Sequence, residues 1–161
     1  MEPVPHWRQP LTMGSVKDVA AGKRPIFLPI ELHNEWDLVV QAHHNCLLLG
    51  TPTATREMFV ALKPALREPL HEYMPPVGGP VPQPTEGTLA LLEVARLDAI
   101  QQTQLLQWLD HFTERLPVQV VSTTSEPLFP RVQAGTFLAD LYYKLNVVLI
   151  DLLGTGRRTN V

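Results

Sequence analysis

Short apolar runs alternate with helix-like segments over most of this chain. The expected strands are the segments "CLLLG" (46–50), "GTLALLEV" (87–94), "PVQVVSTT" (117–124) and "NVVLIDL" (146–152). Segments with apolar residues at helical spacing separate them. The clearest is "LDAIQQTQLLQWLDHFTERL" (97–116), with Asp98 as its expected cap and with an apolar stripe formed by Ile100, Leu105, Leu106, Leu109 and Phe112. Further helices are expected after caps at Ser15 and Asn34, from Thr55, and after Gly135, where Tyr143 would pack in the core. This alternation predicts an α/β fold with three layers, in which a mostly parallel sheet lies between helices. In such sheets ligands bind at the carboxyl ends of the strands.

The prolines limit where these elements can continue. The chain has 16 prolines, which gather near the N-terminus and in "MPPVGGPVPQP" (74–84). Proline lacks an N–H donor and fixes its own backbone angle, so we expect a flexible N-terminus (1–13) and a Pro/Gly-rich loop (73–86). The 161 residues are long enough to form a single domain, 1–161. A further strand at "PIFLPIEL" (25–32) rests on β-propensity alone.

Composition excludes several classes of function. The formal net charge is -3, which gives no general affinity for nucleic acid or for anionic membranes. The single cysteine, Cys46, excludes an internal disulfide framework and a thiolate metal cluster, and its apolar neighbours predict a buried thiol. No apolar run approaches the length of a transmembrane helix or a signal segment. We therefore expect a cytoplasmic protein that does not bind DNA directly.

Three other groups of side chains are candidates for a functional site. His33, His43 and His44 have no carboxylate at a ligand-like spacing, so no metal site is expected. The hydroxyl cluster at residues 122–125 has no nucleophile elbow, and strand-end hydrogen bonding explains it better. Trp108 lies at the edge of its helix stripe, where it either widens the buried face or marks a protein contact.

One stretch, "LLLGTPTATREMF" (47–59), predicts a buried strand, a turn and the start of a helix. A phosphate-binding loop has this layout, and it needs glycines so that successive backbone N–H groups can turn toward a phosphate. Here Gly50 is the only glycine, Pro52 offers no donor, and Arg56 stands where a lysine is expected. The segment is therefore either a disguised nucleotide site or a plain strand-to-helix turn with a solvated arginine.

Taken together, four segments resemble the AAA+ domain of bacterial sigma-54-dependent transcription activators, a P-loop NTPase fold. They cover roughly residues 40–152 in the family's order: "LLLGTPTATREMF" at Walker A, "GTLALLEVARLDAIQQTQLLQWLD" at Walker B, "VQVVSTTSEPL" at sensor I and "GTFLADLYYKLNVVLIDL" before and through the fifth strand. The order makes the resemblance specific, since each segment alone would be weak.

Residue by residue, the resemblance implies a degenerate site. The Walker A positions are Gly50, Thr51, Pro52, Thr53, Ala54, Thr55, Arg56 and Glu57. Among them Thr53 and Thr55 replace glycines and Arg56 replaces the lysine, whereas Glu57 matches the family. Arginine keeps the charge, but its planar fork is a poor substitute for a compact ammonium between two phosphates.

The remaining catalytic positions have changed as well. Leu92 stands at the Walker B aspartate that would hold magnesium, and Glu93 is the remnant of its catalytic pair. Ser125 stands at the sensor I asparagine, and the two arginine-finger positions are Leu138 and Lys144. The resemblance therefore implies a pseudo-ATPase that needs no ATP or magnesium, the cofactors of active relatives.

The expected function is that of a non-catalytic interaction or regulatory module in bacterial transcription regulation. The resemblance implies a short form that lacks the GAFTGA loop, the helical lid and the helix-turn-helix. Its partner would be a protein, either a second copy or an AAA+ transcription activator. The alternative is a switch that binds ATP or ADP without hydrolysis. A third reading, an enzyme built on Glu93 and the hydroxyl cluster, lacks a metal ligand or base.

Overall fold

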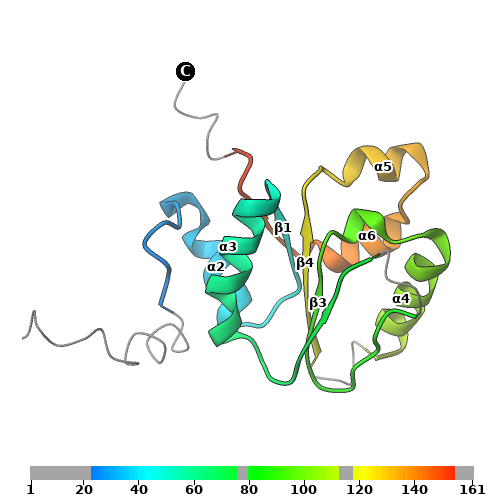
Figure 1. The fold of residues 1–161 in the computed structure, drawn as a ribbon, viewed down its shortest axis with the longest axis horizontal. Coiled ribbons are helices and arrows are strands. Elements are labelled where there is room, and N and C mark those ends of the chain that lie inside the picture. The colour runs from blue at the N-terminus through cyan, green and yellow to red at the C-terminus, as the bar shows by residue number, and fades with distance from the viewer. Residues whose placement is uncertain (1–22, 76–79, 113–117, 155–161) are drawn as a thin grey trace, which may run out of the picture.

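The computed structural model describes residues 23–75, 80–112 and 118–154 (Figure 1). Five parallel strands form one sheet in the order β2-β3-β4-β1-β5. The strands are β1 (Cys46–Leu49), β2 (Leu70–Tyr73), β3 (Gly87–Leu91), β4 (Val118–Thr124) and β5 (Val148–Asp151). The helices are α2 (His33–Val40), α3 (Pro52–Leu62), α4 (Ala99–Phe112), α5 (Phe129–Ala134) and α6 (Ala139–Leu145). Short 3-10 turns lie at η2 (Ile30–Leu32), η3 (Lys63–Ala65) and η4 (Val94–Arg96).

The sheet separates two apolar cores, which confirms the three-layer prediction. Helices α2 and α3 cover one face, and α4, α5 and α6 lie on the other (Figure 1). Successive strand residues point to opposite faces, so Leu48 packs with Trp36 of α2, whereas Leu47 packs with Leu105 of α4. Because both faces are covered, β1 is buried along its whole length, as its uninterrupted apolar run indicates.

The prediction of a strand at residues 25–32 is wrong. The segment forms two turns, in which the N–H of Leu28 bonds the carbonyl of Pro25 and that of Leu32 bonds the carbonyl of Pro29. A proline cannot donate to a strand ladder, and two of them in eight residues favour turns. The second turn leads into α2, which begins at His33 rather than after a cap at Asn34.

The fifth strand, β2, lies later in the chain, where no strand was predicted. Leu70–Tyr73 pairs in parallel with β3 at the edge of the sheet, so the Pro/Gly-rich segment expected from residue 73 follows a strand. The strand is short and none of its residues is fully buried, which leaves almost no apolar signal in the sequence. Helix and strand propensity alone could not find it.

The helices on the second face also depart from the expected pattern. Asp98 does cap α4, since its carboxylate accepts from the N–H of Gln101 at 2.7 Å. Trp108 is buried and widens the apolar face, whereas Ile100, expected in the stripe, is 70% exposed. Gly135 ends α5 in a left-handed conformation, and α6 begins only at Ala139.

Two sequence predictions lie outside the described residues. These are the flexible N-terminus (1–13) and the helix cap at Ser15, and part of the Pro/Gly-rich loop, 76–79, also lies outside. Within the described part of the chain, no helix combines the length and the apolar content needed to cross a bilayer.

Cys46 gives a direct test of how tightly β1 is held. The thiol is fully buried, and burial raises its pKa to about 12. Because the thiolate is the reactive species, we expect no labelling by a thiol-specific disulfide reagent at neutral pH until the protein unfolds. Labelling measured against urea should follow the unfolding curve from circular dichroism, and rapid labelling of the native protein would contradict the burial.

Candidate functional site

A groove of about 1260 Å³ opens beside the carboxyl ends of the strands. Helix α3 forms one wall, and β2 with the segments that follow β3 and β4 forms the other. Several predicted site residues line it together, namely Pro52, Thr53, Thr55, Arg56, Glu57, Leu92 and Glu93. These predicted site residues therefore lie around one groove at the end of the sheet where ligands bind in such folds.

The turn expected to hold phosphate is very short. Only Gly50 and Thr51 separate β1 from α3, which begins at Pro52 rather than near Thr55. Thr51 caps the helix, its hydroxyl accepting from the N–H of Ala54 at 3.1 Å. The N–H of Thr55 bonds the carbonyl of Thr51, and the N–H of Gly50 bonds the carbonyl of Thr124.

These hydrogen bonds decide what the turn can offer a ligand. A phosphate-binding loop presents several free N–H groups in succession, but here the N–H groups of Gly50, Ala54 and Thr55 are used internally. The Thr55 hydroxyl is likewise bonded to the carbonyls of Thr51 and Pro52. The Arg56 side chain is exposed one turn into the helix.

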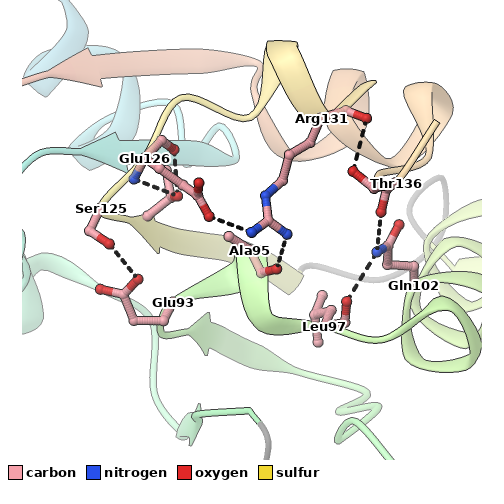
Figure 2. Close-up of polar contacts among 9 residues, drawn as sticks. Glu93, Ala95, Leu97, Gln102, Ser125, Glu126, Arg131 and Thr136 are labelled. Carbon is pink, nitrogen blue, oxygen red and sulfur yellow. Dashed lines mark hydrogen bonds and ion pairs between the residues drawn. The ribbon is translucent and has the colours of Figure 1, made fainter. Parts of the chain in front are cut away.

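Across the groove, the end of β3 places Leu92 and Glu93. Leu92 packs against the apolar core shared with α3. Its side chain has no oxygen with which to bind a hard cation. Glu93 has a left-handed backbone, with φ 54°, and its N–H donates to the Thr123 hydroxyl at 2.9 Å. Its carboxylate accepts from the Ser125 hydroxyl at 3.1 Å (Figure 2). Glu93 and the residue at the sensor I position thus meet in space.

A set of hydrogen bonds ties this side of the groove to α5 and α6. Arg131 donates to the carbonyl of Ala95 at 2.9 Å and forms an ion pair with Glu126 at 2.7 Å (Figure 2). No sequence motif singled out Arg131. Its hydrogen bond to Ala95 joins residues 36 apart along the chain, so no local spacing identified it.

Gln102 is a second residue that the sequence analysis missed. Its side chain is only 4% exposed, and its amide donates to the carbonyls of Leu97 at 3.1 Å and Thr136 at 3.2 Å. Its own oxygen accepts from the N–H of Leu138 at 2.9 Å. One side chain thereby joins the segment after β3 to the start of α6 (Figure 2). The sequence did contain one signal for this role, a glutamine at a position on the apolar face of the predicted helix, because a buried polar side chain needs hydrogen-bond partners.

The two arginine-finger positions do not line the groove. Leu138 lies just before α6 and is 38% exposed. The Lys144 ammonium forms an ion pair with Asp110 of α4 at 2.8 Å, so its charge is used within the chain. Neither side chain presents a free guanidinium to a neighbouring molecule.

The other candidate clusters have structural roles. Within the described residues, no three His, Cys, Asp or Glu side chains gather as metal ligands would. Burial and nearby Arg67 lower the pKa of His43. In the hydroxyl cluster, Thr124 bonds the carbonyl of Glu126, which agrees with the strand-end role. Tyr143, expected in the core, is 62% exposed.

The comparisons with known proteins agree with this architecture. A family model described as "Sigma-54 interaction domain" matches residues 70–154. The chain is 31% identical over 117 residues to the HTH-type transcriptional regulatory protein TyrR of Enterobacter agglomerans, covering 67% of this chain and 22% of that protein. It is 30% identical over 124 residues to the Nif-specific regulatory protein of Azotobacter vinelandii, covering 71% and 23%. The chain thus spans about a fifth of these relatives' length.

Solved structures share the fold at low sequence identity. NtrX from Brucella abortus, in complex with ADP, superposes with a TM-score of 0.62 at 18% identity, covering 87% of this chain and 39% of that chain. The RuvB Holliday junction branch migration motor of Thermotoga maritima superposes with a TM-score of 0.58 at 16% identity, covering 83% and 49%. These are AAA+ P-loop NTPases, which confirms the predicted fold class.

Proposed function

The chain belongs to the sigma-54 interaction domain family, and from this premise we propose that it is a non-catalytic member. Its relatives are named as transcription regulators, so the family links the chain to transcription regulation. In this proposal the domain keeps the AAA+ fold, does not hydrolyse ATP, and acts by binding another protein. That protein is a second copy, an AAA+ activator subunit, or the transcription machinery that the family name implies.

The observation that carries the proposal is the start of α3 at Pro52. The helix begins five positions before Glu57, so the segment that would wrap around a phosphate is instead helical. The N–H of Ala54 is capped by the Thr51 hydroxyl, and the N–H of Thr55 bonds the Thr51 carbonyl. A phosphate would have to displace these bonds to be held as in a working loop.

Two further features support the loss of hydrolysis. Leu92 removes the carboxylate that would hold magnesium, and hard cations require oxygen ligands. Leu138 and Lys144 leave no arginine to stabilise charge on a neighbour's phosphate, a loss worth on the order of 10³–10⁵ in rate. Each change weakens catalysis separately, and together they affect metal, phosphate and transition state.

The test is ATP turnover with a matched variant at the remnant glutamate. We expect purified protein to release no phosphate above background with ATP and magnesium, and we expect Glu93→Gln to behave identically. The reason is that Glu93 has no metal-bound nucleotide beside it to act on. Phosphate release would be followed by a coupled enzyme assay over hours. Turnover that disappears in Glu93→Gln would refute the proposal.

The second candidate is a nucleotide switch without hydrolysis. Arg56 and Thr53 line the groove near the start of α3, where a cation and a helix end attract anions. Calorimetric titration with ATP and ADP, each with and without magnesium, separates the two functions. Micromolar binding that is lost in Arg56→Ala would favour the switch, and no heat up to millimolar nucleotide would favour the interaction module.

A further inference from the structure

The rim of the groove carries apolar side chains that are exposed in the described part of the chain. Phe27, Val60 and Met74 are 56%, 54% and 47% exposed, and all three line the groove. They come from the segment before α2, from the outer side of α3 and from the end of β2. Apolar residues gathered around one concave surface, rather than scattered singly, are typical of a binding site.

Only some of the charged side chains in the groove have a hydrogen-bond or ion-pair partner among the described residues. Lys63 is neutralised by Glu72 in an ion pair of 2.8 Å, and the Glu93 carboxylate accepts from Ser125. In contrast, the Arg56 and Arg96 guanidinium groups have no hydrogen-bond or ion-pair partner among the described residues, and both line the groove. Each guanidinium has five N–H donors, so these two side chains offer donors that no other described residue uses.

Glu57 is the remaining carboxylate of the groove, and among the described residues it forms no ion pair with either guanidinium. It follows Arg56 directly on α3, so the two side chains leave the helix about 100° apart. Neighbouring positions on a helix do not face each other, and both side chains are exposed to water. The two guanidiniums therefore remain available to an acceptor that enters from outside.

The size and lining of the groove favour a peptide over a nucleotide. Its volume of about 1260 Å³ exceeds the roughly 300–1,000 Å³ usual for small-molecule pockets. A nucleotide's phosphates would find the N–H groups of Ala54 and Thr55 already bonded. They would also leave Val60 and Met74 exposed to solvent, whereas a peptide with apolar side chains would bury them.

We propose that the groove between α3 and the ends of β2 and β3 binds an acidic peptide segment of a partner protein. Carboxylates of that segment pair with Arg56 and Arg96, and its apolar side chains cover Val60 and Met74. Arginine forks match carboxylates in bidentate geometry, which gives orientation as well as affinity. This inference rests on the proposed function and names the partner's chemistry at the same site.

The experiment is selection of random twelve-residue peptides, displayed on phage, against the purified chain. We expect the selected peptides to combine Asp or Glu with Leu, Ile or Phe. A labelled selected peptide should then bind in fluorescence anisotropy, with affinity that falls as salt increases. The double variant Arg56→Ala/Arg96→Ala should weaken it by about tenfold or more. Val60→Ser should weaken it by several-fold without changing the salt dependence.

The matched control is Arg67→Ala, which removes an equal charge from an exposed residue outside the groove. It should leave the peptide affinity unchanged. Selection of no peptides, selection of peptides without carboxylates, or equal binding by the double variant would each overturn the inference. Binding of ATP through Arg56 with no peptide selected would overturn it as well.

Failure of the inference and failure of the proposed function give different results. ATP turnover that depends on Glu93 refutes the proposed function, whatever the peptides do. Absence of peptide binding in a protein that also lacks turnover refutes only the acidic segment.

Discussion

Gly87→Ala is expected to destabilise the domain by about 3 kcal/mol or more, a large fraction of the stability of a typical domain. A Cβ atom at Gly87 would lie 2.1 Å from the backbone oxygen of Pro69 and 2.8 Å from its nitrogen. Backbone atoms cannot move aside as the end of a flexible side chain can. The same oxygen accepts the N–H of Thr88 at 3.0 Å, so any shift also weakens the junction of β2 with β3. Urea unfolding followed by circular dichroism measures the loss.

Gly135→Ala is the matched control for this prediction. Gly135 also has a positive φ, 77°, but nothing lies within 4 Å of its added Cβ. The Gly135→Ala substitution should lower the free energy of unfolding only by the strain of a left-handed backbone, about 1–2 kcal/mol. The difference between the two variants isolates the close approach of β3 to Pro69. Equal effects would mean that the contact yields easily and that the description of this junction is wrong.

Gln102→Leu is expected to cost about 3 kcal/mol and to loosen the start of α6. Leucine fills a similar volume, but it leaves the carbonyls of Leu97 and Thr136 and the N–H of Leu138 without their partner. Unpaired polar groups in a buried site cost more than the original bonds contribute. Amide hydrogen exchange should therefore increase at residues 136–139 before the rest of the domain.

The same substitution at Gln107, on the same helix but exposed, serves as its control. Gln107→Leu removes no hydrogen bond within the described part of the chain, so we expect a change within about 0.5 kcal/mol. If Gln102→Leu were equally mild, water or a shifted backbone must satisfy the three groups. The Gln102 hydrogen bonds that join the segment after β3 to the start of α6 would then contribute little to the free energy of unfolding.

The two junctions matter for function because they hold the walls of one groove. Gly87 lets β2 approach β3, and Gln102 and Arg131 hold the segment after β3 against α5 and α6. A nucleotide-driven machine needs such junctions to change with each cycle, whereas a binding module needs them fixed. The proposed interaction role therefore predicts that these contacts persist whether or not ATP is present.

Much of the fold could be predicted from the sequence because buried parallel strands and amphipathic helices have strong local signals. β1, β3, β4, β5 and α4 all lie where apolar runs and helical spacing indicated. β2 could not be found, since an edge strand with half-exposed residues has little apolar pattern, and it is paired only because β3 is beside it. The prediction for residues 25–32 was wrong for the opposite reason, because β-propensity favoured a strand that two prolines prevent.

For the candidate site, the sequence identified the positions but not their geometry. The order of segments placed Arg56 and Glu93 near one another at the strand ends, and both line the groove. The early start of α3, the exposed apolar rim and the bonds of Gln102 depend on contacts between distant segments. Local spacing contains no information about such contacts.

By itself, the sequence determined the order of the strands along the chain, and its resemblance to the family implied which residues stand at the Walker A, Walker B, sensor I and arginine-finger positions. The strand order follows from periodicity and residue type, which act over a few neighbouring residues. Only the tertiary structure decided that Lys144 is held by Asp110, that Arg56 and Arg96 lie beside the same groove with no partner among the described residues, and that Leu92 packs against the core. These outcomes depend on which distant side chains meet when the sheet closes, because charge pairing and burial are properties of the packed molecule.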